Sequence, residues 1–129
     1  MTVSFFGHRI VAEDIRIVLQ EILIHLIENK GADIFYVGNH GGFDRIVRKI
    51  LRGLKVYYPH IQYSVVLAYM PIKRKDDEGC DDDTIFPEGF ENNHPKYAIV
   101  ARNKWMLDRA DMLVTYVKDR SGGAAFLKN

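Results

Sequence analysis

Short apolar runs alternate along this chain with longer segments of helical periodicity, and this alternation limits the possible folds more than any other feature. The apolar runs predict strands at 3–6, 33–37, 63–69 and 112–117. The segments between them place apolar residues three and four positions apart, which predicts helices. We expect these helices at 12–29, 43–57 and 97–109. Strands that alternate with helices are typical of an α/β fold, in which a parallel sheet carries helices on both faces.

The length and composition fit a single domain, 1–129. A hydrophobic share of 47% is normal for a globular chain of 129 residues. With 18 basic and 17 acidic residues the net charge is +1, so no general attraction to nucleic acid or to a membrane surface is expected. Cys80 is the single cysteine, which excludes an internal disulfide. No segment is apolar over enough residues to span a bilayer and no leader peptide is recognisable, so we expect a cytoplasmic protein.

A glycine-rich turn joins the second predicted strand to the second predicted helix. It contains Gly38, Asn39, Gly41, Gly42 and Asp44. Backbone N–H groups in such a turn, together with a helix N-terminus, suit a phosphate or another anion. The spacing matches neither a Walker A loop nor a dinucleotide-binding fingerprint, so a plain tight turn is the alternative. Asp44 lies in the first helical turn, where it either caps free N–H groups or accepts a hydrogen bond from a ribose hydroxyl.

Other polar and small residues follow the remaining strands or lie on the third helix. Because ligands of open α/β sheets bind beyond the carboxyl ends of the strands, we expect these residues to converge at one edge. An arginine there can grip a phosphate with two hydrogen bonds, although a surface arginine is an equally simple interpretation. These candidates are Gly7, His8, Arg9, Arg102, Asn103, Ser121, Gly122 and Gly123.

The stretch 71–95 is predicted to be a long irregular loop. Its acidic run, 76–83, lacks the ligand spacing and the closing glutamate of a calcium loop, so we interpret it as a solvated segment. The histidines are too scattered for a metal site. We therefore predict neither a metal nor a cofactor.

Four motifs occur in a fixed order along the chain and together resemble one superfamily. They are 5–9 (FFGHR), 36–44 (YVGNHGGFD), 102–106 (RNKWM) and 121–124 (SGGA). This set resembles the SLOG superfamily, named for the Smf/DNA-processing protein A and Lonely-guy proteins, and in particular its small stand-alone bacterial members.

The resemblance covers nearly the whole chain and implies a Rossmann-like sheet with a pocket for a nucleotide or nucleotide-derived ligand. By motif, 7–9 would line this pocket, and Gly38, Gly41, Gly42 and Asp44 would form its floor. Arg102 and Asn103 would form one wall, and Gly122 with Gly123 would cradle the phosphate. The first hypothesis for function is therefore a binding module that senses or sequesters a nucleotide-derived molecule.

The chain departs from the Lonely-guy enzymes at the positions that matter for hydrolysis. Those enzymes carry a Pro-Gly-Gly-x-Gly-Thr loop followed by a catalytic glutamate, and the segment after Ser121 has neither the third glycine nor the glutamate. Glu88 and Glu91 remain as candidates for a catalytic acid or base. A nucleotide N-glycosidase or phosphoribohydrolase is thus the second hypothesis, and an interaction protein with a vestigial pocket is the third.

The segment after Gly123 is predicted to begin a helix. Residues 124–129 make less than two helical turns, so this helix would be short or truncated. A doubly wound sheet needs a full helix to cover its face there, so we expect a partner subunit to cover it in a homo-oligomer.

Overall fold

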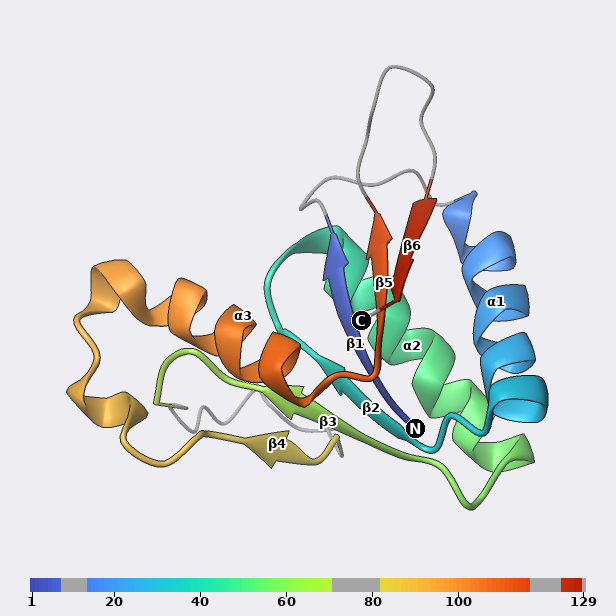
Figure 1. Cartoon of the computed structure of the whole chain (residues 1–129), viewed down its shortest axis with the longest axis horizontal. Helices are drawn as coiled ribbons and strands as arrows, with labels where there is room; N and C mark the ends of the chain where they lie inside the picture. Colours follow the sequence, from blue (N-terminus) through green and yellow to red (C-terminus); the bar gives the residue numbers. More distant parts are fainter. Residues whose placement is uncertain (8–13, 71–81, 117–123, 129) are drawn as a thin grey trace, which may run out of the picture.

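The part of the chain that the structure describes forms a six-stranded sheet with three α-helices (Figure 1). The computed structural model describes residues 1–7, 14–70 and 82–116 in full and 124–128 as backbone alone. The strand order is β4-β3-β2-β1-β5-β6, with β1 to β5 parallel and β6 antiparallel to β5. The elements are β1 (Thr2–Gly7), α1 (Ile15–Lys30), β2 (Ile34–Val37), α2 (Gly41–Tyr57), β3 (Gln62–Val66), β4 (Thr84–Ile85), two 3₁₀ turns, η1 (Phe90–Asn92) and η2 (Pro95–Tyr97), α3 (Ala98–Arg109), β5 (Met112–Tyr116) and β6 (Ala124–Lys128).

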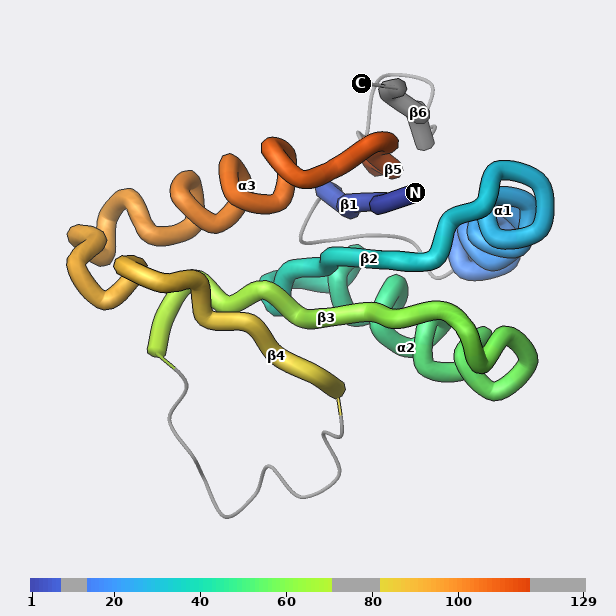
Figure 2. Tube along the Cα trace, turned by 60° about the horizontal axis from the view of Figure 1, so that its bottom comes forward, coloured from blue at the N-terminus to red at the C-terminus, as the bar shows by residue number. Residues whose placement is uncertain are grey.

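Helices cover both faces of the sheet, as the alternation predicted. Figure 2 shows α3 on one side of the strands and α1 and α2 on the other. On the side of α1 and α2, alternate residues of the strands, such as Phe5 and Phe35, are fully buried against both helices in the main core. On the opposite side, Ser4 Oγ donates a hydrogen bond of 2.9 Å to the Met106 carbonyl oxygen, which fixes α3 over β1. The predicted α/β fold with a parallel sheet is confirmed.

The prediction of a helix after Gly123 is wrong. Ala124–Lys128 forms β6, which pairs with β5 from Tyr116↔Ala124 to Met112↔Lys128. The pairing provides hydrogen-bond partners for the backbone N–H and C=O groups along the outer edge of β5. A local pattern of small residues does not reveal this contact between distant segments.

Other differences lie at the ends of elements. β3 ends at Val66 rather than at Tyr69, because the chain bends after Leu67. The stretch predicted as irregular contains the two-residue strand β4 and the turn η1, and η2 begins at its last residue. These elements are too short to produce a periodic pattern. Gly31, with φ 74°, closes α1 at Lys30, one residue beyond the predicted end of this helix. None of the helices that the structure describes is both long and apolar enough to cross a membrane.

Candidate functional site

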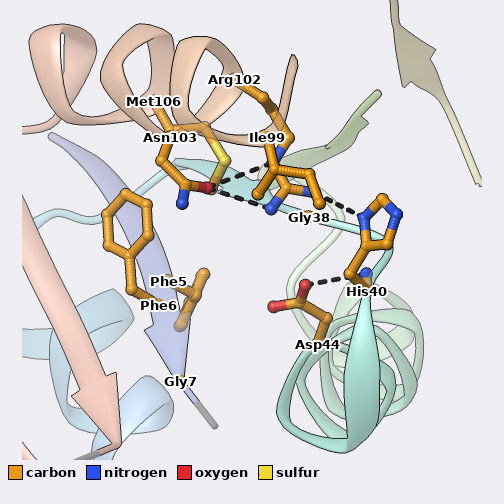
Figure 3. A pocket seen from close by; sticks show the side chains of 10 residues that line it. All are labelled: Phe5, Phe6, Gly7, Gly38, His40, Asp44, Ile99, Arg102, Asn103 and Met106. Carbon is orange, nitrogen blue, oxygen red and sulfur yellow. Dashed lines mark hydrogen bonds between the residues drawn. The ribbon is translucent and has the colours of Figure 1, made fainter. Parts of the chain in front are cut away.

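A cavity of about 240 Å³ lies at the end of β1, between the β2–α2 turn and α3 (Figure 3). The carboxyl ends of β1 and β2 meet there because the two strands are parallel neighbours. From the opposite side, α3 contributes one face at the spacing of successive helical turns. The lining residues are Phe5, Phe6, Gly7, Gly38, His40, Asp44, Ile99, Arg102, Asn103 and Met106.

Gly38 leaves room for two oppositely charged groups to approach each other. A Cβ atom on Gly38 would lie 2.7 Å from Arg102 Nη1 and 2.7 Å from Asp44 Oδ2. Both separations are shorter than carbon tolerates, so a side chain here would displace a charged group. Glycine is therefore needed at this turn for space.

Arg102 is a buried cation held by uncharged partners. Only 5% of the surface of Arg102 is exposed to solvent. Nη1 donates to His40 Nδ1 at 3.0 Å, and Nε and Nη2 donate to Asn103 Oδ1 at 3.2 and 3.0 Å. Burial lowers the pKa of Arg102, and the negative charge of Asp44 opposes this shift only in part. No ion pair joins Arg102 to another described residue, so its charge is poorly compensated.

Arg102 also fixes the orientation of the two side chains that hold it. Because a guanidinium only donates hydrogen bonds, the acceptor in Asn103 is its amide oxygen. The amide nitrogen of Asn103 then points into the cavity (Figure 3). In the same way, His40 accepts through Nδ1, so its neutral ring carries the proton on Nε2. The α3 side of the cavity is thus rich in hydrogen-bond donors.

Asp44 supplies the negative charge of the cavity. One carboxylate oxygen, Oδ2, accepts a hydrogen bond of 3.0 Å from the His40 backbone N–H, so the predicted capping role is confirmed. The other oxygen points across the cavity toward β1 (Figure 3). Burial raises the pKa of the Asp44 carboxyl, and the His40 N–H and the charges of Arg102 and Arg48 counteract only part of that shift.

Replacing Asp44 by asparagine is expected to stabilise the fold at neutral pH. Asparagine keeps an acceptor oxygen for the His40 N–H but carries no charge to bury. Since the folded-state pKa of Asp44 is raised, the wild type loses stability relative to Asp44→Asn as pH rises from about 4 through that pKa. Urea unfolding at a series of pH values measures this difference. The exposed Asp108→Asn variant is the control, and a difference for Asp44→Asn that does not change with pH would contradict the prediction.

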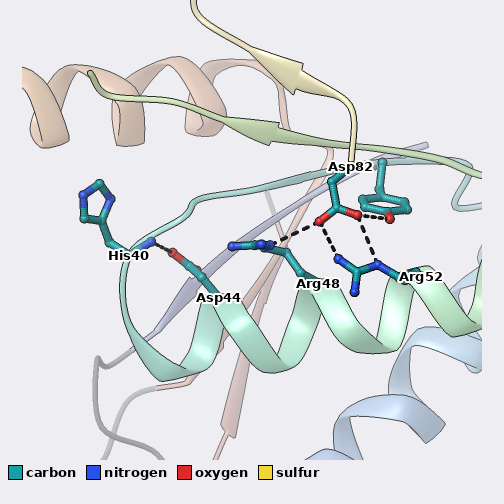
Figure 4. A network of polar contacts seen from close by, with 6 residues as sticks. His40, Asp44, Arg48, Arg52 and Asp82 are labelled. Atoms are coloured by element: carbon teal, nitrogen blue, oxygen red, sulfur yellow. Dashed lines mark hydrogen bonds and ion pairs between the residues drawn. The ribbon is translucent and has the colours of Figure 1, made fainter. Parts of the chain in front are cut away.

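A second polar cluster lies further along α2 and fixes the residues before β4 (Figure 4). Asp82, whose side chain is 4% exposed, accepts hydrogen bonds from Tyr63 Oη at 2.5 Å and Arg52 Nη2 at 2.9 Å. Arg48 Nε donates to the same carboxylate at 3.4 Å. Asp82 belongs to the acidic run predicted to be solvated, so the prediction is wrong for this residue: three donor side chains replace the water that it loses.

Replacing Asp82 by asparagine is expected to lower the free energy of unfolding by about 1.5 kcal/mol, the size of a charge-assisted hydrogen bond. Burial alone would raise the pKa of Asp82, but the hydrogen bonds of Tyr63 and Arg52 and the charges of Arg52 and Arg48 hold it below its ordinary value. This stabilisation is complete above about pH 4 and is lost as pH falls through the folded-state pKa. Urea unfolding of both proteins at pH 7 and pH 3 measures the loss. Equal differences at the two pH values would refute the charge-based explanation.

The structure brings together five of the residues that the sequence singled out: Gly7, Gly38, Asp44, Arg102 and Asn103 line one cavity. Three others lie beside this cavity but do not line it: Asn39 is exposed, and Gly41 and Gly42 form the first turn of α2. The predicted residues His8, Arg9, Ser121, Gly122 and Gly123 lie outside the described part of the chain. Glu88 and Glu91 are exposed and do not line this cavity.

Sequence reasoning missed half of the lining residues. Ile99 and Met106 lie three residues before Arg102 and three residues after Asn103, so helical spacing from the predicted pair would have found both. His40 lies inside the predicted turn, but nothing in the local sequence indicates that it accepts a hydrogen bond from Arg102. Among the described residues, no group of three or more His, Cys, Asp or Glu side chains is arranged to hold a metal ion.

Comparison with protein-family models and with curated proteins identifies no relatives of this chain. No protein-family model matches the chain, and none of the curated proteins searched matches it either. Membership of the SLOG superfamily therefore stays a prediction from the motifs, and the function has to be argued from the cavity itself.

Proposed function

We propose that this protein binds a nucleotide-derived small molecule in the cavity between β1, the β2–α2 turn and α3. The observation that carries the proposal is the buried guanidinium of Arg102, which faces the cavity without an ion pair among the described residues. A buried cation of this kind destabilises the free protein unless a ligand supplies the missing negative charge. A phosphate group is a suitable ligand, because it is anionic and accepts bidentate hydrogen bonds from arginine.

The other polar groups of the cavity suit a sugar next to that phosphate. Asn103 presents N–H donors, whereas Asp44 presents a carboxylate that accepts hydrogen bonds from hydroxyl groups. Between these polar groups, Phe6 and Ile99 offer apolar surface for a ring. Since cavities for drug-sized ligands measure about 300–1,000 Å³, a cavity of about 240 Å³ suits one part of a nucleotide.

Removing the guanidinium is expected to weaken binding by roughly 10- to 100-fold, the cost of a charge-assisted hydrogen bond. A thermal-shift screen of nucleoside monophosphates, cyclic dinucleotides and ADP-ribose identifies the ligand, and calorimetry compares the wild type with Arg102→Ala. A ligand at 100 times its dissociation constant should add about 2.7 kcal/mol of stability.

Lys104→Ala is the matched control for Arg102→Ala. It also removes one positive charge from α3, but the side chain of Lys104 is 73% exposed and pairs with Asp108 on the surface. Binding should survive this change within about twofold, because exposed ion pairs contribute little. The proposal is wrong if no molecule of the screen stabilises the wild type, or if both variants lose affinity equally.

A second candidate function rests on the raised pKa of Asp44. A carboxyl that holds its proton more tightly than usual inside a cavity can act as a general acid or base. In the nucleotide N-glycosidase hypothesis, the candidate acid or base is therefore Asp44, which lines the cavity, rather than Glu88 or Glu91. Release of free base from a nucleoside monophosphate, lost in Asp44→Asn, would support catalysis. Binding without release in the wild type would leave a sensing or sequestering module.

A further inference from the structure

A second cavity, of about 180 Å³, lies beyond the end of β3 and shares a wall with the first. Tyr69 lines the second cavity, and its ring meets that of His40, which lines the first, edge to face at 6.0 Å between centroids. Along α3, Ala98 lines the second cavity and the next residue, Ile99, lines the first. Because Tyr69 is 44% and Ile99 37% exposed, the shared wall reaches the surface. A ligand in the first cavity can therefore extend over this wall into the second.

The second cavity contains an unsatisfied hydrogen-bond donor. Asn93 Nδ2 is buried and has no hydrogen-bond partner, and it is the one such side-chain atom found among the described residues. The backbone around it is fixed, since Asn93 N–H bonds the Phe90 carbonyl at 3.0 Å and His94 caps the following turn. A buried donor without an acceptor in the protein is unfavourable, so this position suits an acceptor group of a ligand.

The walls around this donor suit a flat aromatic ring. Phe86 and Phe90 lie perpendicular to each other, with centroids 6.2 Å apart, and Met70 adds a flexible apolar surface. Glu91 lines the same cavity from an exposed position and offers a carboxylate that accepts hydrogen bonds. The cavity thus combines apolar walls, a buried donor without an acceptor and a carboxylate that can accept a hydrogen bond.

We propose that the second cavity binds the base of the nucleotide whose sugar and phosphate occupy the first. The matching base carries a ring acceptor for Asn93 and an exocyclic amino group for Glu91, as adenine, guanine and cytosine do. Uracil and hypoxanthine carry a carbonyl oxygen in place of the amino group, so an acceptor would face the Glu91 carboxylate at that position. This inference rests on the proposed function, and it adds a base-reading site on β3 and η1 that is separate from Arg102.

Two matched pairs of ligands test the amino group: AMP against IMP, and CMP against UMP. Calorimetry on the full chain should show the amino form of at least one pair binding about 10-fold more tightly than its oxo form, the size of one hydrogen bond to a charged group. Glu91→Gln should bring the two affinities of that pair together. Equal affinities within both pairs in the wild type would overturn the proposal.

Asn93→Leu tests the unsatisfied donor with little risk to folding, because an apolar side chain of similar shape removes an unpaired buried group. It should weaken AMP or CMP binding about 10-fold while leaving binding of ribose 5-phosphate, which has no base, unchanged. Asn92→Leu, at the exposed neighbouring position, is the control and should change neither affinity.

The two proposals fail in different ways. If Arg102→Ala weakens binding of ribose 5-phosphate and of nucleotides but Asn93→Leu and Glu91→Gln change nothing, the base-binding proposal is wrong and the proposed function stands. If ribose 5-phosphate, the four nucleotides and the other molecules of the screen all fail to bind the wild type, both proposals are wrong.

Discussion

Gly7→Ala is expected to lower the free energy of unfolding by about 3 kcal/mol, at the upper end of the usual range for overpacking. A Cβ atom on Gly7 would lie 2.3 Å from Cγ and 2.9 Å from Cβ of Phe43. Phe43 cannot withdraw, because it is 1% exposed and its ring stacks on Tyr116 at 6.0 Å. The extra methyl group must therefore push β1 away from α2, at the edge where the first cavity begins. Urea unfolding monitored by circular dichroism measures the effect.

Gly53→Ala is the matched control for Gly7→Ala. Gly53 lies in the middle of α2, is exposed, and has no atom within 4 Å of a built Cβ. Alanine there should stabilise the protein by about 0.5–1 kcal/mol, because it restricts the unfolded chain and favours the helix. If both variants shift stability in the same direction, the close contact between Gly7 and Phe43 does not determine the result.

The features that were predictable from the sequence are those set by local periodicity and by one topological rule. Alternating strands and helices specify a parallel sheet, and the carboxyl ends of its strands then bring Gly38 and Asp44 to the same edge as Gly7. The residues 124–128 misled the prediction because small residues after two glycines resemble a helix start, whereas pairing with β5 decides their conformation.

The features that were not predictable depend on contacts between distant segments. Nothing local marks Asp82 as buried, since its donors come from α2 and β3, up to 34 positions away in the sequence. Likewise, Arg102 and His40 are 62 positions apart, and only the folded chain joins them. Motif reasoning therefore found Arg102, Asp44 and the acceptor Asn103, but it missed the second acceptor, His40.

Gly38→Ala is expected to abolish ligand binding, with a loss of more than about 100-fold, while the fold survives. The methyl group would fall 2.7 Å from both Arg102 Nη1 and Asp44 Oδ2, so it displaces the cation and the carboxylate together. Losing two charged contacts costs more affinity than losing either one.

The stability cost of Gly38→Ala should remain near 1–2 kcal/mol, since the ends of two side chains can shift where the ring of Phe43 cannot. The comparison with Gly7→Ala is therefore the decisive one. Gly7→Ala should reduce stability most, whereas Gly38→Ala should reduce affinity most, as measured by calorimetry with the ligand found in the screen. If Gly38→Ala binds the ligand with wild-type affinity, the ligand does not occupy the space over Gly38 between Arg102 and Asp44. The proposal that this cavity is the binding site would then be wrong.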